Sequence, residues 1–191
     1  MQEKVQPRLL QNTIQLKDYS LGQEEHYDLD TKTEWIKNIL TEIENEIDPE
    51  LKDEDLEAST LTVHFEMLRQ DNDDELGDHL MVRGNFQADF QCHCVRCLKV
   101  MKQQVDQDFA YCYLPPYMEE HEAFKDATDV YCEGEEMDLH FYDKKGKMDL
   151  SEIIYEQIQL NMDPLPLHSE DCKGLCGYCG VDLNKESCKH Q

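Results

Sequence analysis

Apolar residues recur at helical spacing between residues 30 and 47, and this periodicity predicts an amphipathic α-helix. Asp30 or Thr31 is the expected N-cap, because Glu34 follows Thr31 by three residues, as in a capping box. Pro49 lies in the acidic stretch that follows and should end the helix in a solvated linker. We expect the apolar stripe to pack on the sheet of the same domain; it consists of Trp35, Ile36, Ile39, Leu40, Ile43 and Ile47.

Alternation of apolar and polar residues predicts an antiparallel sheet in the middle of the chain. Strands are expected within residues 61–67, 80–92 and 105–113, with a shorter strand around 137–141. The acidic stretch 71–78 should separate the first two strands. A cysteine pair between the second and third strands is therefore expected at or near a hairpin tip.

A second helix is predicted to begin after Asp149, which forms a capping pair with Glu152, and to end at Pro164. Together these elements predict an α+β fold. We expect an antiparallel β-sheet, partly barrel-like, with flanking helices and a C-terminal cysteine-rich zinc-binding tail.

The length of the chain favours a single domain over residues 1–191. Within it we expect an N-terminal extension over 1–28, an α+β body over 29–166 and a zinc-binding tail over 167–191. The N-terminus is polar and mixed, with no apolar stretch long enough for a signal peptide or a membrane span. A cytoplasmic location without membrane attachment is therefore expected.

Acidic residues outnumber basic ones, with 43 Asp and Glu against 18 Lys and Arg and a net charge of −25. Such a charge disfavours extensive direct binding of nucleic acid, because that affinity comes mainly from Lys and Arg that displace counterions. A basic protein partner would instead be attracted. The alternative is that the acidity only keeps the chain soluble.

The chain has nine cysteines, an odd number, and six of them fall in closely spaced groups. In a reducing compartment such groups indicate metal ligands rather than disulfides. Cys176 and Cys179 form a C-x-x-C pair, and Gly180 after them permits the positive φ of a zinc-binding turn. A tail this short and polar would need the binding energy of a structural zinc ion, on the order of 10 kcal/mol, to fold.

Several ligand sets are compatible with the spacing, and all of them include Cys176 and Cys179. A local site would use the tail alone, through Cys172, Cys176, Cys179 and Cys188, with His168 or His190 as a substitute for one sulfur. A bridging site would join the tail to the hairpin tip through Cys94, Cys97, Cys176 and Cys179. Two sites with four ligands each are also conceivable, because there are eight candidate ligands.

The remaining cysteines, Cys92, Cys112 and Cys132, are expected to be small core residues. A redox role for the pair at the hairpin tip is disfavoured, since no helix N-terminus lies there to lower a thiol pKa. The sequence contains no Ser–His–Asp order, phosphate-binding Gly-rich loop or HExxH motif. We therefore expect neither an enzyme nor a small-molecule substrate.

The sequence resembles the YceD family of large ribosomal RNA subunit accumulation proteins from about Leu61 to His190. The resemblance is carried by C-V-R-C-L at 94–98, K-M-D-L at 147–150, L-N-M-D-P-L-P-L at 160–167 and the cysteine-rich tail from 171. His168 and His190 stand where many relatives have a cysteine.

The resemblance implies a non-enzymatic factor for the synthesis, processing or accumulation of large-subunit (23S) ribosomal RNA and for ribosome biogenesis. With the charge, it suggests a ribosomal protein or an assembly factor as the partner, so that contact with ribosomal RNA is indirect. The basic residues near the hairpin tip and in the tail could form one local patch for RNA. The alternatives are a zinc- or thiol-dependent RNA-processing enzyme and a zinc-ribbon adaptor in transcription or proteolysis.

Overall fold

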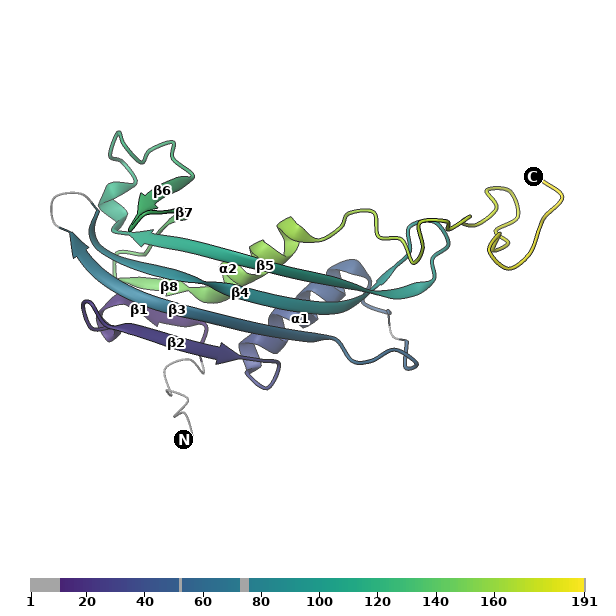
Figure 1. Cartoon of the computed structure of the whole chain (residues 1–191), viewed down its shortest axis with the longest axis horizontal. Helices are drawn as coiled ribbons and strands as arrows, with labels where there is room; N and C mark the ends of the chain where they lie inside the picture. The colour runs from purple at the N-terminus through teal and green to yellow at the C-terminus, as the bar shows by residue number, and fades with distance from the viewer. Residues whose placement is uncertain (1–10, 52, 73–75, 191) are drawn as a thin grey trace.

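Three long antiparallel strands form the middle of the molecule (Figure 1). The computed structural model describes residues 11–51, 53–72 and 76–190. In the main sheet, β5 and β7 are parallel and the other neighbours are antiparallel. The order of its strands is β2 (Glu24–Leu29), β3 (Thr60–Asn72), β4 (Gly77–His93), β5 (Val100–Leu114), β7 (Glu135–Phe141) and β6 (Asp129–Cys132).

Two short strands form a second sheet, in which β1 (Thr13–Gln15) pairs with β8 (Lys147–Asp149). Two 3₁₀ turns complete the regular structure, η2 (Leu16–Asp18) and η3 (Pro116–Met118).

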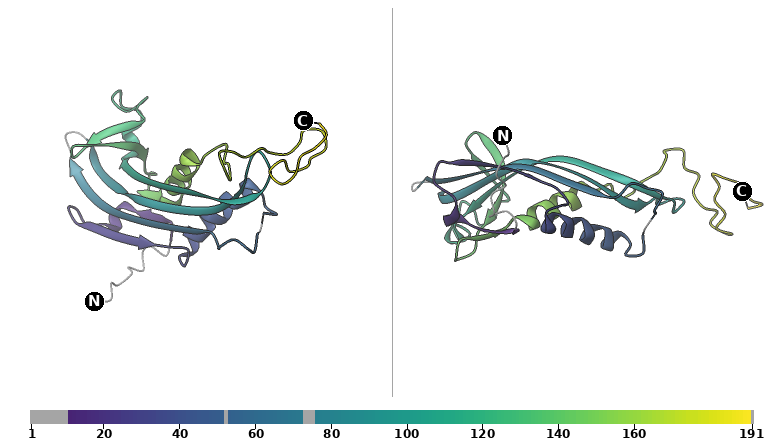
Figure 2. Two further views of the ribbon diagram at one scale, coloured as in Figure 1. Left: turned by 45° about the vertical axis from the view of Figure 1, so that its right-hand side comes forward. Right: turned by 90° about the horizontal axis from the view of Figure 1, so that it is seen from below.

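Both helices pack on one face of the main sheet (Figure 2). Their bounds are Glu34–Ile47 for α1 and Leu150–Asn161 for α2. The apolar stripe of α1 is buried there, as its spacing predicts, against alternating side chains of β3 such as Val63 and Phe65. The main core therefore lies between the helices and the sheet.

The structure corrects three details of the sequence prediction. The main sheet is open, with β2 at one edge and β6 at the other, so it is not closed into the expected partial barrel. Helix α1 begins later than expected, with Thr33 as its N-cap, and Thr33 makes no side-chain capping hydrogen bond. Residues 11–28, expected to form an extension, contribute β1 and β2 to the two sheets.

The tail leaves the body beyond α2 and projects past the hairpin tip between β4 and β5 (Figure 1). Within its described residues, up to His190, the tail contains no helix or named strand, only turns and the isolated bridge between Leu175 and Asp182. Its shape therefore depends on side-chain contacts, and the tail contains four cysteines and two histidines that could supply them.

Candidate metal centres

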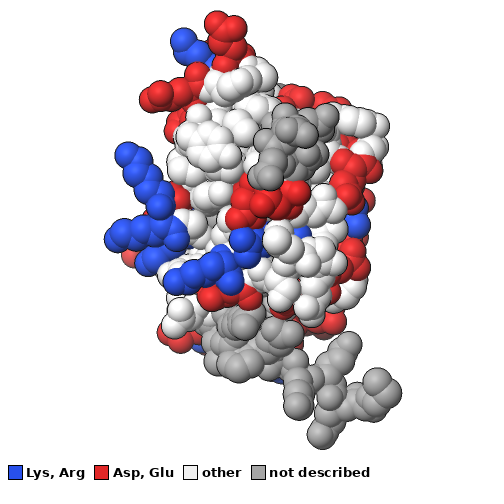
Figure 3. Space-filling model, turned by 90° about the vertical axis from the view of Figure 1, so that its left-hand side faces the viewer, with Lys and Arg blue, Asp and Glu red and all other residues white. Residues whose placement is uncertain are grey.

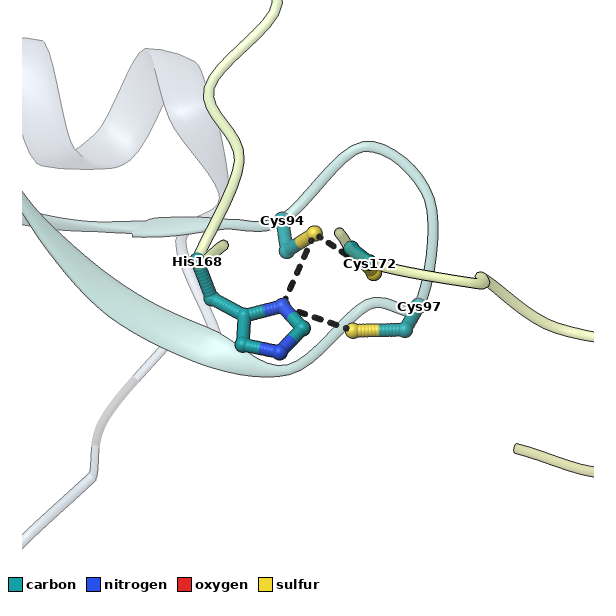
Figure 4. Close-up of side chains that lie close together, drawn as sticks. All are labelled: Cys94, Cys97, His168 and Cys172. Carbon is teal, nitrogen blue, oxygen red and sulfur yellow. Dashed lines mark hydrogen bonds between the residues drawn. The ribbon is translucent and has the colours of Figure 1, made fainter. Parts of the chain in front are cut away.

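The first candidate centre joins the hairpin tip to the start of the tail (Figure 4). The Sγ atom of Cys94 lies 3.8 Å from that of Cys172 and 3.4 Å from Nδ1 of His168. The same imidazole nitrogen is 3.3 Å from Sγ of Cys97. The three cysteines are buried, and His168 is half-buried. Four metal-binding side chains, 71 to 78 residues apart across the two segments, thus converge on one point.

Backbone hydrogen bonds hold the tail against the hairpin tip. The N–H of Val95 donates to the carbonyl of Pro166, and the N–H of Leu175 donates to that of Arg96, both at 3.0 Å. The Arg96 guanidinium donates to the carbonyl oxygens of Glu170 and Cys172. Arg96 therefore fixes the tail, which leaves it less available for the RNA patch suggested by the sequence.

The second candidate centre lies wholly within the tail and consists of Cys176, Cys179, Cys188 and His190. One candidate ligand atom from each of these residues lies within 4.8 Å of the others. Sγ of Cys176 and Nδ1 of His190 are 4.0 Å apart. This centre is more open than the first, because Cys179 and His190 are exposed.

The two C-x-x-C turns have the same backbone hydrogen bonds. At the hairpin tip, Leu98 N–H donates to the Cys94 carbonyl and Cys94 N–H to the Lys99 carbonyl, both at 2.9 Å. In the tail, Gly180 N–H donates to the Cys176 carbonyl, and Cys176 N–H donates to the Val181 carbonyl, both at 2.8 Å. The residue after each pair has a positive φ, 59° for Leu98 and 73° for Gly180. Two segments with different neighbours thus form the same turn.

These turns favour the thiolate form of their first cysteine. Burial raises the pKa of the Cys94 thiol, but hydrogen bonds from His168 and from the backbone N–H groups of Cys97 and Arg96 together lower it to about 5. Backbone hydrogen bonds from Cys179 and Tyr178 lower the pKa of the Cys176 thiol to about 6. The thiolate is the form of cysteine that binds metals, so the first cysteine of each turn is in a form suited to metal binding.

The donor sets fit a tetrahedral soft or borderline cation. A zinc ion with four ligands and Zn–S distances of about 2.3 Å separates two sulfurs by about 3.8 Å. That value matches the separation of the Cys94 and Cys172 sulfurs, 3.8 Å. Each centre offers three sulfurs and one imidazole nitrogen, so each could hold one metal ion with protein ligands at all four positions.

All six cysteines predicted from the sequence to be metal ligands lie in these two centres. Their grouping differs from both the local and the bridging arrangement. Cys172 lies with the hairpin cysteines, contrary to the local arrangement. Cys176 and Cys179 do not lie with the hairpin cysteines, contrary to the bridging arrangement. The third alternative, two groups of four candidate ligands, matches the observed arrangement, in which His168 and His190 each belong to one group. Spacing could not assign Cys172, because three residues separate it both from His168 and from Cys176.

Other groups of polar side chains are less suited to a metal. Glu24, His26 and Glu66 lie together on the open face of the sheet, but Arg83 forms ion pairs with both glutamates. Cys92, Cys112 and Cys132 are buried, as expected of small core residues. Among the described residues, the two cysteine–histidine centres are therefore the candidates with ligands suited to zinc.

A family model described as "Large ribosomal RNA subunit accumulation protein YceD" matches residues 82–191. The match covers more than half of the chain and includes both centres, the hairpin tip and α2. The chain belongs to the YceD family. The first part of the sheet, β2 and β3, and helix α1 lie outside the residues matched to YceD.

A curated relative is an uncharacterized protein of Mycobacterium leprae (strain TN), 28% identical over 110 residues. The aligned segment covers 58% of this YceD-family chain but only 46% of the relative, so the chain spans about half of that protein's length. No solved structure matches the chain significantly. Among the described residues, none of the helices has the length and hydrophobicity needed to span a membrane.

Proposed function

We propose that this chain is a non-enzymatic factor for the synthesis, processing or accumulation of 23S ribosomal RNA in large-subunit biogenesis, with structural zinc in both centres. The observation that carries the proposal is that the residues matched to the YceD family contain two complete sets of four metal ligands. The family name supplies the role in ribosomal RNA accumulation, and the two centres explain how its cysteine-rich end could fold.

The zinc ions would act as the core of the tail. Few apolar side chains of the tail are buried, and the cluster at its base consists of Cys94, Cys97 and Cys172 with half-buried Met101, Leu167 and Leu175. Zinc at the first centre would attach the tail to the hairpin, and zinc at the second would fold its end. Each ion would contribute on the order of 10 kcal/mol, which exceeds what so small a cluster provides.

The closed donor sets support a role without catalysis. A catalytic zinc ion usually has three protein ligands and one open position for water or substrate. Each centre here has four protein ligands, so a bound zinc ion would have no open position. An RNA-processing enzyme remains the competing function, and purified protein incubated with precursor ribosomal RNA separates the two. Metal-dependent cleavage that Cys176→Ser abolishes would establish the enzyme.

A basic ribosomal protein or assembly factor is the proposed partner, in the cytoplasm, because the net charge of −25 attracts cationic surfaces. Of the six basic residues expected to form an RNA patch near the tail, which are Arg96, Lys99, Lys102, Lys173, Lys185 and Lys189, three have partners within the chain. Arg96 binds tail carbonyls, Lys102 pairs with Asp89 at 2.9 Å and Lys185 pairs with Asp182 at 3.4 Å. RNA contact through this end of the molecule is therefore weakly supported.

The proposal is tested by depletion and complementation. Depletion should lower 23S ribosomal RNA relative to 16S, and the wild-type chain should restore it. A double variant, Cys176→Ser with Cys179→Ser, should fail to restore it and should lose one of two zinc ions per chain by elemental analysis. Cys92→Ala is the control, because Cys92 is buried, as Cys176 is, but lies outside both centres. Unchanged 23S ribosomal RNA after depletion would refute the function.

A further inference from the structure

Lysine side chains gather at the end of the molecule opposite the tail. Figure 3 looks at this end and shows basic side chains close together beside acidic ones. The patch is built on the β1–β8 sheet and the turn before β8, and we call it the lysine turn. Its four members are exposed: Lys17, Lys144, Lys145 and Lys147.

The backbone of the lysine turn is fixed by hydrogen bonds. Oδ1 of Asp143 accepts from the N–H groups of Lys145 and Lys147, at 2.7 and 2.8 Å. The N–H of Gly146 donates to the Asp143 carbonyl at 2.8 Å, and Gly146 has the φ of 73° that suits glycine. The turn therefore presents its lysines from a defined position.

The fourth lysine comes from a distant part of the chain. The N–H of Leu16 donates to the carbonyl of Gly146 at 2.8 Å, and Gln15 lies opposite Lys147 in the β1–β8 register. Lys17 follows Leu16 directly, so pairing of β1 with β8 brings its backbone to the same turn. The two segments are about 130 residues apart in sequence and share one exposed basic surface.

Among the described residues, the lysines that form ion pairs are Lys32, Lys102 and Lys185. None of these belongs to the lysine turn. Two neighbouring carboxylates accept hydrogen bonds from the backbone. The N–H groups of Lys147 and Lys145, together with attraction to the charges of the same lysines, lower the pKa of Asp143. Asp143 accepts the backbone bonds of the turn, and Asp149 caps α2 while binding the Asn12 amide.

We propose that the lysine turn binds the phosphate backbone of an RNA strand. Exposed ammonium groups on a fixed turn attract polyanions, and each phosphate contact releases counterions. The surrounding acidic surface repels further phosphates, so the contact stays local and has a defined orientation. The choice of ribosomal RNA as the polyanion rests on the proposed function. It adds a direct contact with RNA to that function, whereas the net charge alone suggested only contact through a protein partner.

The test measures binding of the full, zinc-loaded chain to 23S ribosomal RNA transcribed in vitro, over a series of salt concentrations. The triple variant Lys144→Gln, Lys145→Gln and Lys147→Gln removes three charges from the turn. A matched triple, Lys32→Gln, Lys37→Gln and Lys125→Gln, removes three exposed lysine charges elsewhere. Because a single-stranded phosphate contact contributes about 0.7 to the slope of log Kd against log salt, the first triple should lower the slope by about 2. The second should leave it nearly unchanged.

Three results would overturn the proposal: equal loss of affinity in both triples, an unchanged slope in the first triple, or binding to anionic phosphatidylglycerol vesicles without binding to RNA. Circular dichroism and zinc content should match the wild type, since the replaced side chains are exposed. If the first triple binds RNA normally and restores 23S ribosomal RNA in depleted cells, the lysine turn is excluded while the proposed function stands. If depletion leaves 23S ribosomal RNA unchanged, the function fails independently of the binding result.

Discussion

Leu98 and Gly180 occupy the same position in the two C-x-x-C turns but differ in their conformational cost. A side chain in the left-handed region costs about 1–2 kcal/mol, whereas glycine adopts it freely. Leu98 is 59% exposed, so burial compensates little for this cost. We therefore expect Leu98→Gly to raise the free energy of unfolding by about 1 kcal/mol, as measured by urea titration of the zinc-loaded protein.

The reciprocal variant, Gly180→Leu, is the matched control. A Cβ atom at Gly180 would meet no other atom within 4 Å, so its effect is conformational rather than steric. It should lower the stability of the tail by a similar amount. If Leu98→Gly were instead less stable than the wild type, the contacts of the leucine side chain would stabilise the turn by more than its conformational cost.

The histidine ligand of the first centre should be replaceable by another soft donor. His168→Cys keeps four ligands and should retain two zinc ions per chain, because a Cys₄ site also binds zinc tightly. His168→Ala leaves three ligands and should weaken the first centre by at least tenfold in competition with a chelator. His121→Ala, in an exposed loop, is the control. Equal zinc affinity in all three variants would remove His168 from the site.

At this scale the sequence identifies the candidate ligands better than the way in which they are grouped. Thiolate chemistry and the glycine after Cys179 suffice to select Cys176 and Cys179. The assignment of Cys172 depends instead on the hydrogen bonds that hold Pro166 and Leu175 against the hairpin tip. Those contacts join residues about 70 to 80 apart, and no local pattern encodes them.

At the scale of secondary structure elements, Gly84 of β4 lies opposite Phe65 of β3. A Cβ atom at Gly84 would lie 2.0 Å from the backbone oxygen of His64 and 2.6 Å from Cα of Phe65. Gly84→Ala should therefore force the strands apart and lower the free energy of unfolding by about 2–3 kcal/mol. Gly177→Ala is the control, since nothing lies within 4 Å of its Cβ position. Equal unfolding midpoints would contradict this account of the sheet.

Elements with a strong hydrophobic period were predictable, and short edge elements were not. The expected strand at 105–113 appears within β5, and the expected Asp149 cap accepts a hydrogen bond from Ser151 N–H at 2.9 Å. Strand β2 escaped prediction because, along its six residues, only Tyr27 and Leu29 are buried. The parallel pairing of β5 with β7 is a long-range choice that alternation alone does not specify.

Removal of metal should unfold the tail and leave the sheet intact, because the main core between the helices and the sheet contains no residue of either centre. With a zinc chelator, trypsin should cut rapidly after the exposed residues Lys173, Lys185 and Lys189. Mass spectrometry of the products should show a stable fragment that contains α2 and all the strands. Identical cleavage with and without the chelator would mean that metal does not order the tail.

The whole molecule places unlike chemistry at its two ends, with the lysine turn at one end and the metal centres at the other (Figure 1). The acidic body between them carries most of the net charge of −25. The carboxylates of the body repel one another, and this repulsion lowers the free energy of unfolding at low ionic strength. Salt shortens the range of this repulsion to about 10 Å at 0.1 M.

We therefore expect the melting temperature of the zinc-loaded protein to rise by several degrees between 10 and 200 mM NaCl and then to level off as screening becomes complete. Calorimetry checks this, and a continued linear rise above 1 M would instead indicate salt exclusion from the surface.

The matched variant replaces Glu119, Glu120 and Glu122 by lysine in an exposed loop outside the regular elements. Each change raises the net charge by two units, so the variant should melt higher than the wild type in 10 mM salt. It should also respond less to added NaCl, and an unaltered response would mean that local ion pairs, rather than total charge, set the stability of the body.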